Sequence, residues 1–186
     1  MKRYINKSVL GVASLAVLGL ASCSQSKTEM DSYIDNLLSQ MTLEEKIGQL
    51  NLQVCGTFVS GEYFAADNQN AKHQLAKGQL GAYYGFNDYR LIREWQEIAV
   101  NESRLHIPLL FGYDVIHGYR VTFPTPIALS TSWNMDLIER MARISADEAS
   151  ADGINWLFSP MVDVSHDLRW GRVVETFGED PYLTSE

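Results

Sequence analysis

The stretch IPLLFGYDVIHGYR, residues 107–120, decides the fold class of this sequence. Its first five residues form an unbroken apolar run, which is typical of a strand buried on both faces of a parallel sheet. A second run of this kind, INWLF, occupies residues 154–158. Between the two runs, residues 134–153 have helical apolar spacing, with Asn134 placed to cap the helix and Gly153 placed to end it. The order strand, loop, helix, strand indicates a parallel α/β fold.

The residues before this stretch predict three helices and one short strand. Apolar residues repeat at helical spacing over 30–41, and Thr42 with Glu45 forms a capping box that begins a second helix. The alternation over 50–54 predicts a strand. Asn87 is placed to cap a third helix. The predicted inner face of that helix consists of Leu91, Ile92, Trp95, Ile98 and Ala99.

Composition limits the classes of protein to which the chain can belong. It has 186 residues, of which 46% are hydrophobic and 20% are charged, as expected for one folded domain and unlike a collagen-like or disordered chain. No apolar run of 18 residues follows the N-terminus, which excludes a protein with several membrane spans. The net charge of −8 argues against a nucleic-acid partner, because binding along a phosphate backbone requires a basic face.

The N-terminus has the pattern of a bacterial export signal, in which basic residues precede an apolar stretch over 9–20. The Leu-Ala-Ser-Cys sequence that ends at Cys23 resembles a lipobox. We therefore interpret residues 1–22 as a lipoprotein signal peptide and residues 23–30 as a tether. We expect an exported protein in the periplasm or at the outer membrane, attached to the membrane only through a lipid on Cys23. An ordinary cleaved signal with an incidental cysteine is the alternative.

Polar residues follow both apolar runs, where the carboxyl ends of parallel strands meet. Asp114 follows the first run, and Arg172 lies in the loop after the second. Because an unpaired carboxylate at a strand end is unfavourable, we expect Asp114 to face Arg172 and pair with it, leaving donors and acceptors for a ligand. Such a pocket suits sugar hydroxyls. The alternative is a structural salt-bridge network, which we prefer for Asp163, His166 and Asp167.

Four motifs resemble glycoside hydrolase family 3, most closely its bacterial periplasmic β-glucosidase branch. They are TLEEKIGQL at 42–50, FGYDVIHG at 111–118, RWGR at 169–172 and GEDPY at 178–182. The resemblance extends over residues 31–186, which we interpret as the N-terminal barrel domain of that family, truncated. It implies an α/β fold that is the N-terminal, incomplete part of a TIM-like (β/α) barrel. It also implies a retaining, exo-acting β-glucosidase that removes terminal non-reducing β-D-glucosyl residues from β-glucosides or β-linked oligosaccharides.

By the same resemblance, Asp114 and Arg172 hold hydroxyl groups of the terminal glucose. We expect a further set of residues to brace the two loops. These are His117, Arg169, Trp170, Glu175, Glu179 and Asp180. The family usually has a proline where this sequence has Leu168, so the turn is less rigid and Arg172 is less firmly held.

No catalytic carboxylate is assigned to this chain, and Asp114 is interpreted as a specificity residue. A retaining glycosidase needs a nucleophile and an acid/base about 5 to 5.5 Å apart. The family's Ser-Asp-Trp nucleophile motif and its Lys-His motif do not occur in the 186 residues, so we expect both carboxylates downstream of Glu186. A (β/α)₈ barrel takes about 250 residues. We therefore interpret the chain as an N-terminal fragment that neither folds well nor hydrolyses substrate alone.

Three other functions remain open at this point. A β-xylosidase or another family 3 β-glycosidase, such as a β-N-acetylhexosaminidase, shares the family, and a non-catalytic sugar-binding lipoprotein fits the 186 residues as they stand. The ligands of a metal-dependent hydrolase would come from Asp114, His117, Asp163, His166 and Asp167. No HExxH motif or cysteine cluster supports that last function, so we expect neither a metal nor another cofactor.

Overall fold

The computed structural model describes residues 28–54 and 63–186. The predicted signal peptide and the predicted lipidation site, Cys23, lie outside these residues. The chain divides into two units, residues 1–40 and residues 41–186.

The described part of the first unit contains one helix, α2 (Glu29–Gln40). It confirms the helix predicted from apolar spacing, and it includes the last two residues of the predicted tether, 23–30. Thr28 and Asp31 close its first turn. The Thr28 hydroxyl accepts from the Asp31 N–H at 3.1 Å, and the Asp31 carboxylate accepts from the Thr28 N–H at 3.0 Å. No residue of α2 is buried.

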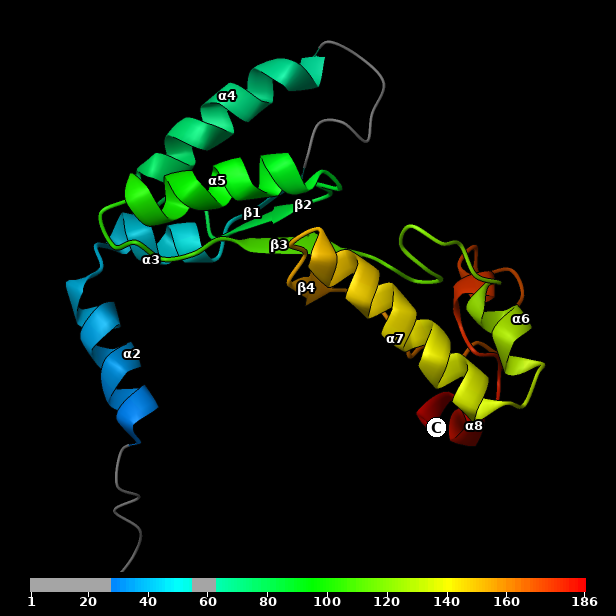
Figure 1. Ribbon diagram of the computed structural model, residues 1–186. Helices are drawn as coiled ribbons and strands as arrows, with labels where there is room; N and C mark the ends of the chain where they lie inside the picture. Colours follow the sequence, from blue (N-terminus) through cyan, green and yellow to red (C-terminus); the bar gives the residue numbers. More distant parts are fainter. Residues whose placement is uncertain (1–27, 55–62) are drawn as a thin grey trace, which may run out of the picture. The chain divides into compact units, whose positions relative to one another are not determined.

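The second unit is built on a parallel sheet whose four strands lie side by side in chain order (Figure 1). They are β1 (Leu52–Val54), β2 (Ala82–Tyr84), β3 (Leu110–Tyr113) and β4 (Trp156–Leu157). Helices occur in each connection between neighbouring strands. This arrangement confirms the parallel α/β fold predicted from the sequence.

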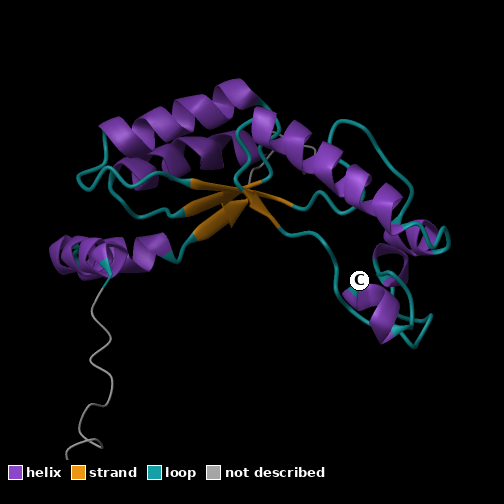
Figure 2. Cartoon of the chain, turned by 60° about the horizontal axis from the view of Figure 1, so that its bottom comes forward, coloured by secondary structure: helices purple, strands orange, loops and turns teal. Residues whose placement is uncertain are grey.

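Helices cover one side of this sheet. The helices of this unit are α3 (Leu43–Gln49), α4 (Tyr63–Ala76), α5 (Tyr89–Asn101), α6 (Pro126–Ser130) and α7 (Met135–Ala151), followed after β4 by the 3-10 helix η2 (Val173–Glu175) and by α8 (Pro181–Ser185). Figure 2 shows α4, α5 and α7 on the same side of the strands. Among the described residues, none of the helices combines the length and the apolar character that crossing a membrane requires.

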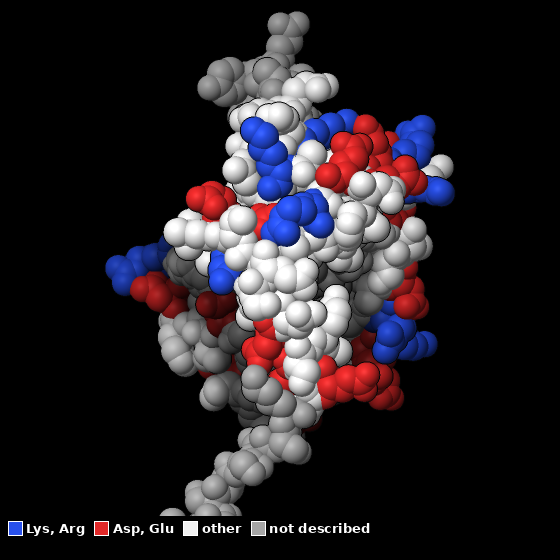
Figure 3. Space-filling model, turned by 90° about the vertical axis from the view of Figure 1, so that its left-hand side faces the viewer, with Lys and Arg blue, Asp and Glu red and all other residues white. Residues whose placement is uncertain are grey.

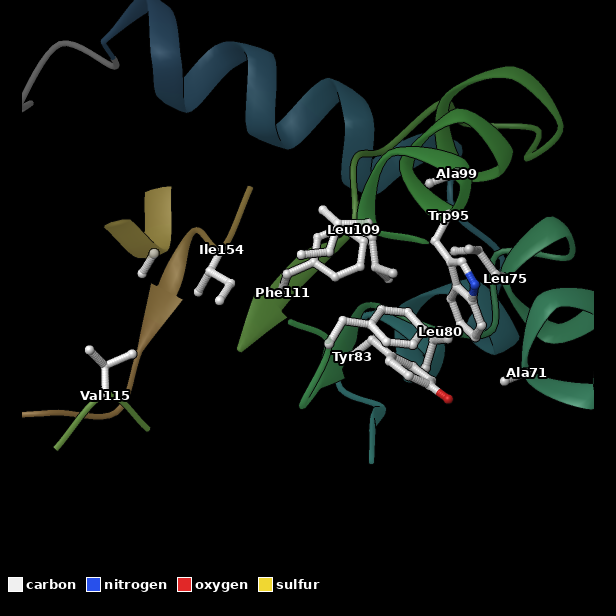
Figure 4. Close-up of a cluster of buried hydrophobic side chains, with 13 residues drawn as sticks. Ala71, Leu75, Leu80, Tyr83, Trp95, Ala99, Leu109, Phe111, Val115 and Ile154 are labelled. Atoms are coloured by element: carbon white, nitrogen blue, oxygen red, sulfur yellow. The ribbon is translucent and has the colours of Figure 1, made fainter. Parts of the chain in front are cut away.

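The hydrophobic core lies between the strands and these helices (Figure 4). Tyr83 of β2 packs against Trp95 of α5, with ring centroids 4.3 Å apart. Phe111 of β3, Leu75 of α4 and Ala149 of α7 complete the same cluster and are almost fully buried. Burying a large apolar side chain in this way stabilises the fold by about 1.5 to 3 kcal/mol.

The opposite face of the sheet is open. The register places Leu52 and Leu110 in one row, and Val54 and Trp156 in the next. These four side chains retain between 37 and 62% of their exposed surface. The prediction that the runs at 107–111 and 154–158 are buried on both faces is therefore wrong for this chain. Only their helix-facing residues are buried, because the described residues supply a covering layer on that side alone.

Strand β3 begins three residues later than predicted, at Leu110 instead of residue 107. The Gln96 side chain of α5 binds both backbone groups of Leu109. Its amide oxygen accepts from the Leu109 N–H at 2.7 Å, and its nitrogen donates to the Leu109 carbonyl at 3.2 Å. Pro108 has no N–H to donate to a strand. The backbone before Leu110 is thus bonded to a helix rather than to the sheet.

Two of the three predicted helix caps are confirmed. Thr42 and Glu45 form the capping box of α3, and the Asn134 side chain accepts from the backbone at the start of α7. The prediction for α5 is wrong, because Asp88 rather than Asn87 caps this helix. The Asp88 carboxylate is the stronger acceptor for the first helical N–H groups, since its charge also interacts favourably with the helix dipole.

Charged side chains of both signs occur on the face drawn in Figure 3. One ion pair has a structural role, because Glu45 is buried while its carboxylate accepts two hydrogen bonds from Arg104, at 3.0 and 2.6 Å. Those bonds, followed by the bond from the Thr42 N–H, hold the pKa of Glu45 below its usual value. The start of α3 is thereby fastened to the segment after α5.

Candidate functional site

Asp114 is the first residue after β3, and its side chain is partly buried. Its carboxylate oxygen Oδ2 accepts a hydrogen bond of 2.6 Å from the hydroxyl of Tyr84, the last residue of β2. Burial raises the pKa of the Tyr84 phenol, and the hydrogen bond to Asp114 and its negative charge raise it further. Tyr84 is consequently a proton donor at neutral pH. One hydrogen bond to a carboxylate thus joins side chains at the carboxyl ends of two neighbouring strands.

A glycine makes room for this contact. Gly112 is paired with Tyr84 across the sheet. A Cβ atom at Gly112 would lie 3.0 Å from the Phe158 ring and 3.6 Å from the Tyr84 ring. The rings of Tyr84 and Phe158 pack together above the glycine, with centroids 5.6 Å apart. The aromatic wall beside Asp114 therefore depends on the absence of a side chain at position 112.

The loop after Asp114 is closed tightly on itself. Val115 is buried in the core and has a φ of 53°, which is rare for a β-branched residue. The His117 ring donates from Nδ1 to the Phe123 carbonyl at 3.0 Å, and the Phe123 N–H donates to the His117 carbonyl at 2.8 Å. Gly118 has a φ of 114°, and a Cβ there would lie 2.0 Å from a backbone oxygen. These two hydrogen bonds join His117 to Phe123 inside the loop that carries Asp114.

The same loop is fastened to helix α7. The Glu148 carboxylate accepts from the backbone N–H groups of Arg120 and Val121, at 2.9 and 3.1 Å. Asp152 accepts from the Tyr119 hydroxyl at 2.8 Å and forms an ion pair with Arg120. These partners lie about thirty residues away in the chain, so they fix the loop to the body of the unit.

Arg172, the other predicted sugar-binding residue, is exposed and lies just before η2. Its guanidinium binds Glu175, with Nε 2.7 Å from Oε2. The hydrogen bonds to Glu175 chiefly raise the pKa of Arg172, and its charge, then those of Asp114 and Asp163, add to the effect. Within the described residues Asp114 and Arg172 form no direct ion pair, so the pairing expected from the sequence is not observed. Asp114 binds Tyr84 instead, and Arg172 binds Glu175.

The remaining residues predicted to brace the Arg172 loop are arranged separately. Arg169 is exposed and binds Asp167 through its backbone and its guanidinium. Asp180 caps α8 by accepting from two backbone N–H groups. Trp170 is 39% exposed, and Glu179 is exposed as well. Of the predicted bracing residues in this loop, Glu175 binds Arg172 directly.

The described residues offer no metal site. In residues 28–54 and 63–186, no three His, Cys, Asp or Glu side chains gather in a way that could hold an ion. The five ligands considered for a metal-dependent hydrolase include Asp114 and Asp167, whose carboxylates instead bind Tyr84 and Arg169.

Comparisons with known proteins place this arrangement in a family. The Glycosyl hydrolase family 3 N terminal domain matches residues 42–186. A periplasmic β-glucosidase from Salmonella typhimurium is 44% identical over 157 residues, which cover 83% of this chain and 19% of that protein. The chain belongs to glycoside hydrolase family 3. Its parallel sheet and helices are accordingly part of the TIM-like barrel of that family's N-terminal domain.

Further family 3 members support the same assignment. The β-glucosidase from Listeria innocua, solved with isofagomine, superposes with a TM-score of 0.71 at 41% identity, covering 83% of this chain and 21% of that one. A β-xylosidase from Formosa agariphila is 31% identical, over 87% of this chain and 18% of that protein. The chain therefore spans about a fifth of the length of the family 3 relatives that it matches.

Tyr84 is not among the site residues predicted from the sequence. No strand is predicted in its segment, because glycines at 78, 81 and 85 obscure a strand of only three residues. Its signal was the apolar Ala82-Tyr83-Tyr84 run between two of these glycines. In a sheet of consecutive parallel strands, that run ends next to the strand that precedes Asp114.

Proposed function

We propose that this chain supplies the part of a family 3 active site that holds the terminal glucose of a β-glucoside. The complete enzyme would act as a retaining, exo-acting β-glucosidase. The support comes from membership of the family, from the β-glucosidases among the relatives, and from the chemistry of Asp114 and Arg172.

Asp114 and Arg172 would divide the recognition of sugar hydroxyls between an acceptor and a donor. A carboxylate accepts hydrogen bonds from neighbouring hydroxyl groups, whereas a guanidinium donates to their oxygen atoms. Hydrogen bonds of this kind strengthen as the sugar distorts toward the oxocarbenium-like transition state, so they contribute to the rate as well as to binding.

We assign neither the nucleophile nor the acid/base to Asp114. A retaining mechanism requires two carboxylates on opposite sides of the scissile bond, about 5 to 5.5 Å apart. Asp114 instead receives a short hydrogen bond from Tyr84. We therefore treat Asp114 as a residue that binds hydroxyl groups, and the Ser-Asp-Trp motif of the family's nucleophile does not occur in the 186 residues.

The single observation that carries the proposal is the partly buried Asp114 carboxylate, held at the carboxyl end of the sheet in the motif that resembles the family's glucose-binding sequence. The test is the substitution Asp114→Ala in the full-length protein. We expect kcat/KM for an aryl β-glucoside to fall about 10²- to 10⁴-fold, because several kcal/mol of transition-state binding are lost at 1.36 kcal/mol per tenfold. Asp147 is an exposed carboxylate on α7, and Asp147→Ala is the matched control. This variant should leave kcat/KM unchanged. Equal kinetics in the two variants would refute the proposal.

β-Xylosidase activity is a second candidate, because a relative that carries this name is 31% identical over most of this chain. The two substrates differ only by the hydroxymethyl group on the sugar ring. Comparing kcat/KM for an aryl β-glucoside and the matching aryl β-xyloside in the full-length protein decides between them. A preference for the xyloside would replace the glucosidase assignment.

We further propose export to the periplasm, with residues 1–22 as the cleaved signal and a lipid on Cys23 as the anchor. The lipobox-like sequence and the periplasmic relative support this proposal. Mass spectrometry of the mature N-terminal peptide tests it. A diacylated or triacylated peptide that begins at Cys23 is expected, and an unmodified N-terminus would contradict the anchor.

A further inference from the structure

We propose that Tyr84 is a positioning residue of the sugar-binding site, whose hydroxyl holds the Asp114 carboxylate in the orientation that accepts sugar hydroxyls. This inference rests on the proposed function and extends it to a residue outside the motifs that resemble the family.

The register of the sheet brings the two residues together. Tyr84 ends β2 and is paired with Gly112 of β3, two positions before Asp114. Its hydroxyl lies 2.6 Å from Oδ2 of Asp114, a length typical of a hydrogen bond between a hydroxyl and a carboxylate. Among the protein groups that the structure describes, no donor contacts the other oxygen, Oδ1. One oxygen is thus fixed by the protein and the other can accept from a ligand.

The phenol ring is itself held in place. Phe158, the residue after β4, packs against it with ring centroids 5.6 Å apart. Tyr113 stacks with it at a centroid distance of 6.2 Å. Because Gly112 has no side chain, the ring lies directly over the strand. A ring enclosed by aromatic neighbours has little freedom to turn away, so the hydroxyl remains directed at Asp114.

A phenol suits this task better than a cationic side chain. Tyr84 donates one hydrogen bond and carries no charge, so the Asp114 carboxylate keeps its full negative charge. A lysine or arginine at this position would offset that charge and weaken the carboxylate as an acceptor. Tyr84 also remains protonated at neutral pH, since burial and the neighbouring carboxylate raise its pKa.

A double-mutant cycle in the full-length protein tests the inference. Tyr84→Phe and Asp114→Ala are made singly and together, and kcat/KM for an aryl β-glucoside and the Kd for glucose are measured in each. We expect Tyr84→Phe alone to lower kcat/KM about 10- to 100-fold, the range for a lost hydrogen bond to a charged group. In the Asp114→Ala background the same substitution should change either quantity less than about twofold, because the group it positions is gone.

Lys72→Met is the control, since it also removes a hydrogen bond to a carboxylate, at 2.6 Å from Glu94, but lies on α4, outside the loop that carries Asp114. Its effect, whatever its size, should be the same with and without Asp114. An equal loss for Tyr84→Phe in both backgrounds would overturn the inference and indicate a general structural role or a direct contact with the sugar. Unchanged kinetics and glucose affinity in Tyr84→Phe would overturn it as well. Neither result touches the proposed function, which is tested separately by the activity of Asp114→Ala and by the comparison of glucoside with xyloside.

Discussion

The loop after β3, which carries Asp114, and the loop after β4, which carries Arg172, are held by different kinds of contact. The first is bonded to distant parts of the unit, through Tyr84 of β2, Glu148 of α7 and Asp152, which follows α7. Val115 additionally buries its side chain in the core.

The second loop is bonded mainly to itself. Its ion pairs join Arg169 to Asp167 and Arg172 to Glu175, two and three residues apart. Its packing contact with the rest of the unit is made by η2, which lies against α6.

In the proposed site, this difference would distinguish a preorganised acceptor from an adjustable donor. Asp114 cannot move without breaking contacts between several elements, so little ordering would remain to be done on binding of a sugar. Arg172 is held mainly by the partly exposed Glu175 carboxylate, a partner that it could exchange for a ligand at small cost.

The largest effect should come from Gly118→Ala. A Cβ there would lie 2.0 Å from the Val121 carbonyl oxygen, at a φ of 114° that disfavours a side chain. We expect the Tm of the full-length protein to fall by about 5 to 10 °C and kcat/KM to fall about 10²-fold, because the Asp114 loop must reorganise. Calorimetry and steady-state kinetics measure the two quantities.

Gly171→Ala in the second loop is the control. A Cβ at Gly171 meets nothing within 4 Å, so neither Tm nor kcat/KM should change appreciably. Similar losses of Tm and kcat/KM in the two alanine variants would show that both loops are equally rigid. That result would contradict the difference that we infer between the loops.

An intermediate effect is expected for Arg172→Lys. Lysine keeps the charge but loses the planar fork, so we expect KM for an aryl β-glucoside to rise about tenfold or more. The Tm should stay within about 1 °C, because the Arg172–Glu175 pair is exposed. A fall of several degrees in Tm would reveal that Arg172 supports the fold and is not merely a donor on a flexible loop.

The smallest effect is expected for Asp167→Asn. The hydrogen bonds from Arg169 lower the pKa of Asp167 below its ordinary 3.8. A lowered pKa means that any stabilisation is present above pH 3.8 and is lost as the pH falls through the lowered value. Both side chains are largely exposed, so the Tm should change by less than about 1 °C at pH 7, and any difference should vanish in strong acid. Thermal melts at pH 7 and below pH 3 check this, and a large shift at pH 7 would contradict it.

Features that depend on neighbouring residues were predictable from the sequence. The capping box of Thr42 and Glu45 and the Asn134 cap require only residues within one helical turn. The parallel fold followed from the alternation of apolar runs and helical spacing. The inner face of α5 was also predicted in part, since Ile92, Trp95 and Ala99 are buried, whereas Leu91 is 36% exposed.

Features that depend on distant residues were not predictable. The start of β3 is set by Gln96, which lies on another element and takes both backbone groups of Leu109. The partner of Asp114 is set by strand register, which places Tyr84 beside it across 30 residues of sequence. A pairing of Asp114 with Arg172 was the natural expectation from charge alone, but a shorter-range carboxylate, Glu175, competes for Arg172.

The peptide bond between Asp114 and Val115 joins the proposed site to the hydrophobic core. The carboxylate that we propose for sugar binding is directly followed by a side chain of the core cluster, which also contains Ala149 and Ile154. A backbone with a φ of 53° at a β-branched residue persists only while its surroundings compel it, at a cost of about 1 to 3 kcal/mol. We therefore expect substitutions that loosen this part of the core to relax the backbone at Val115 and to turn Asp114 away from Tyr84. Under the proposed function, sugar affinity would then depend on the packing of the core as well as on the residues of the site.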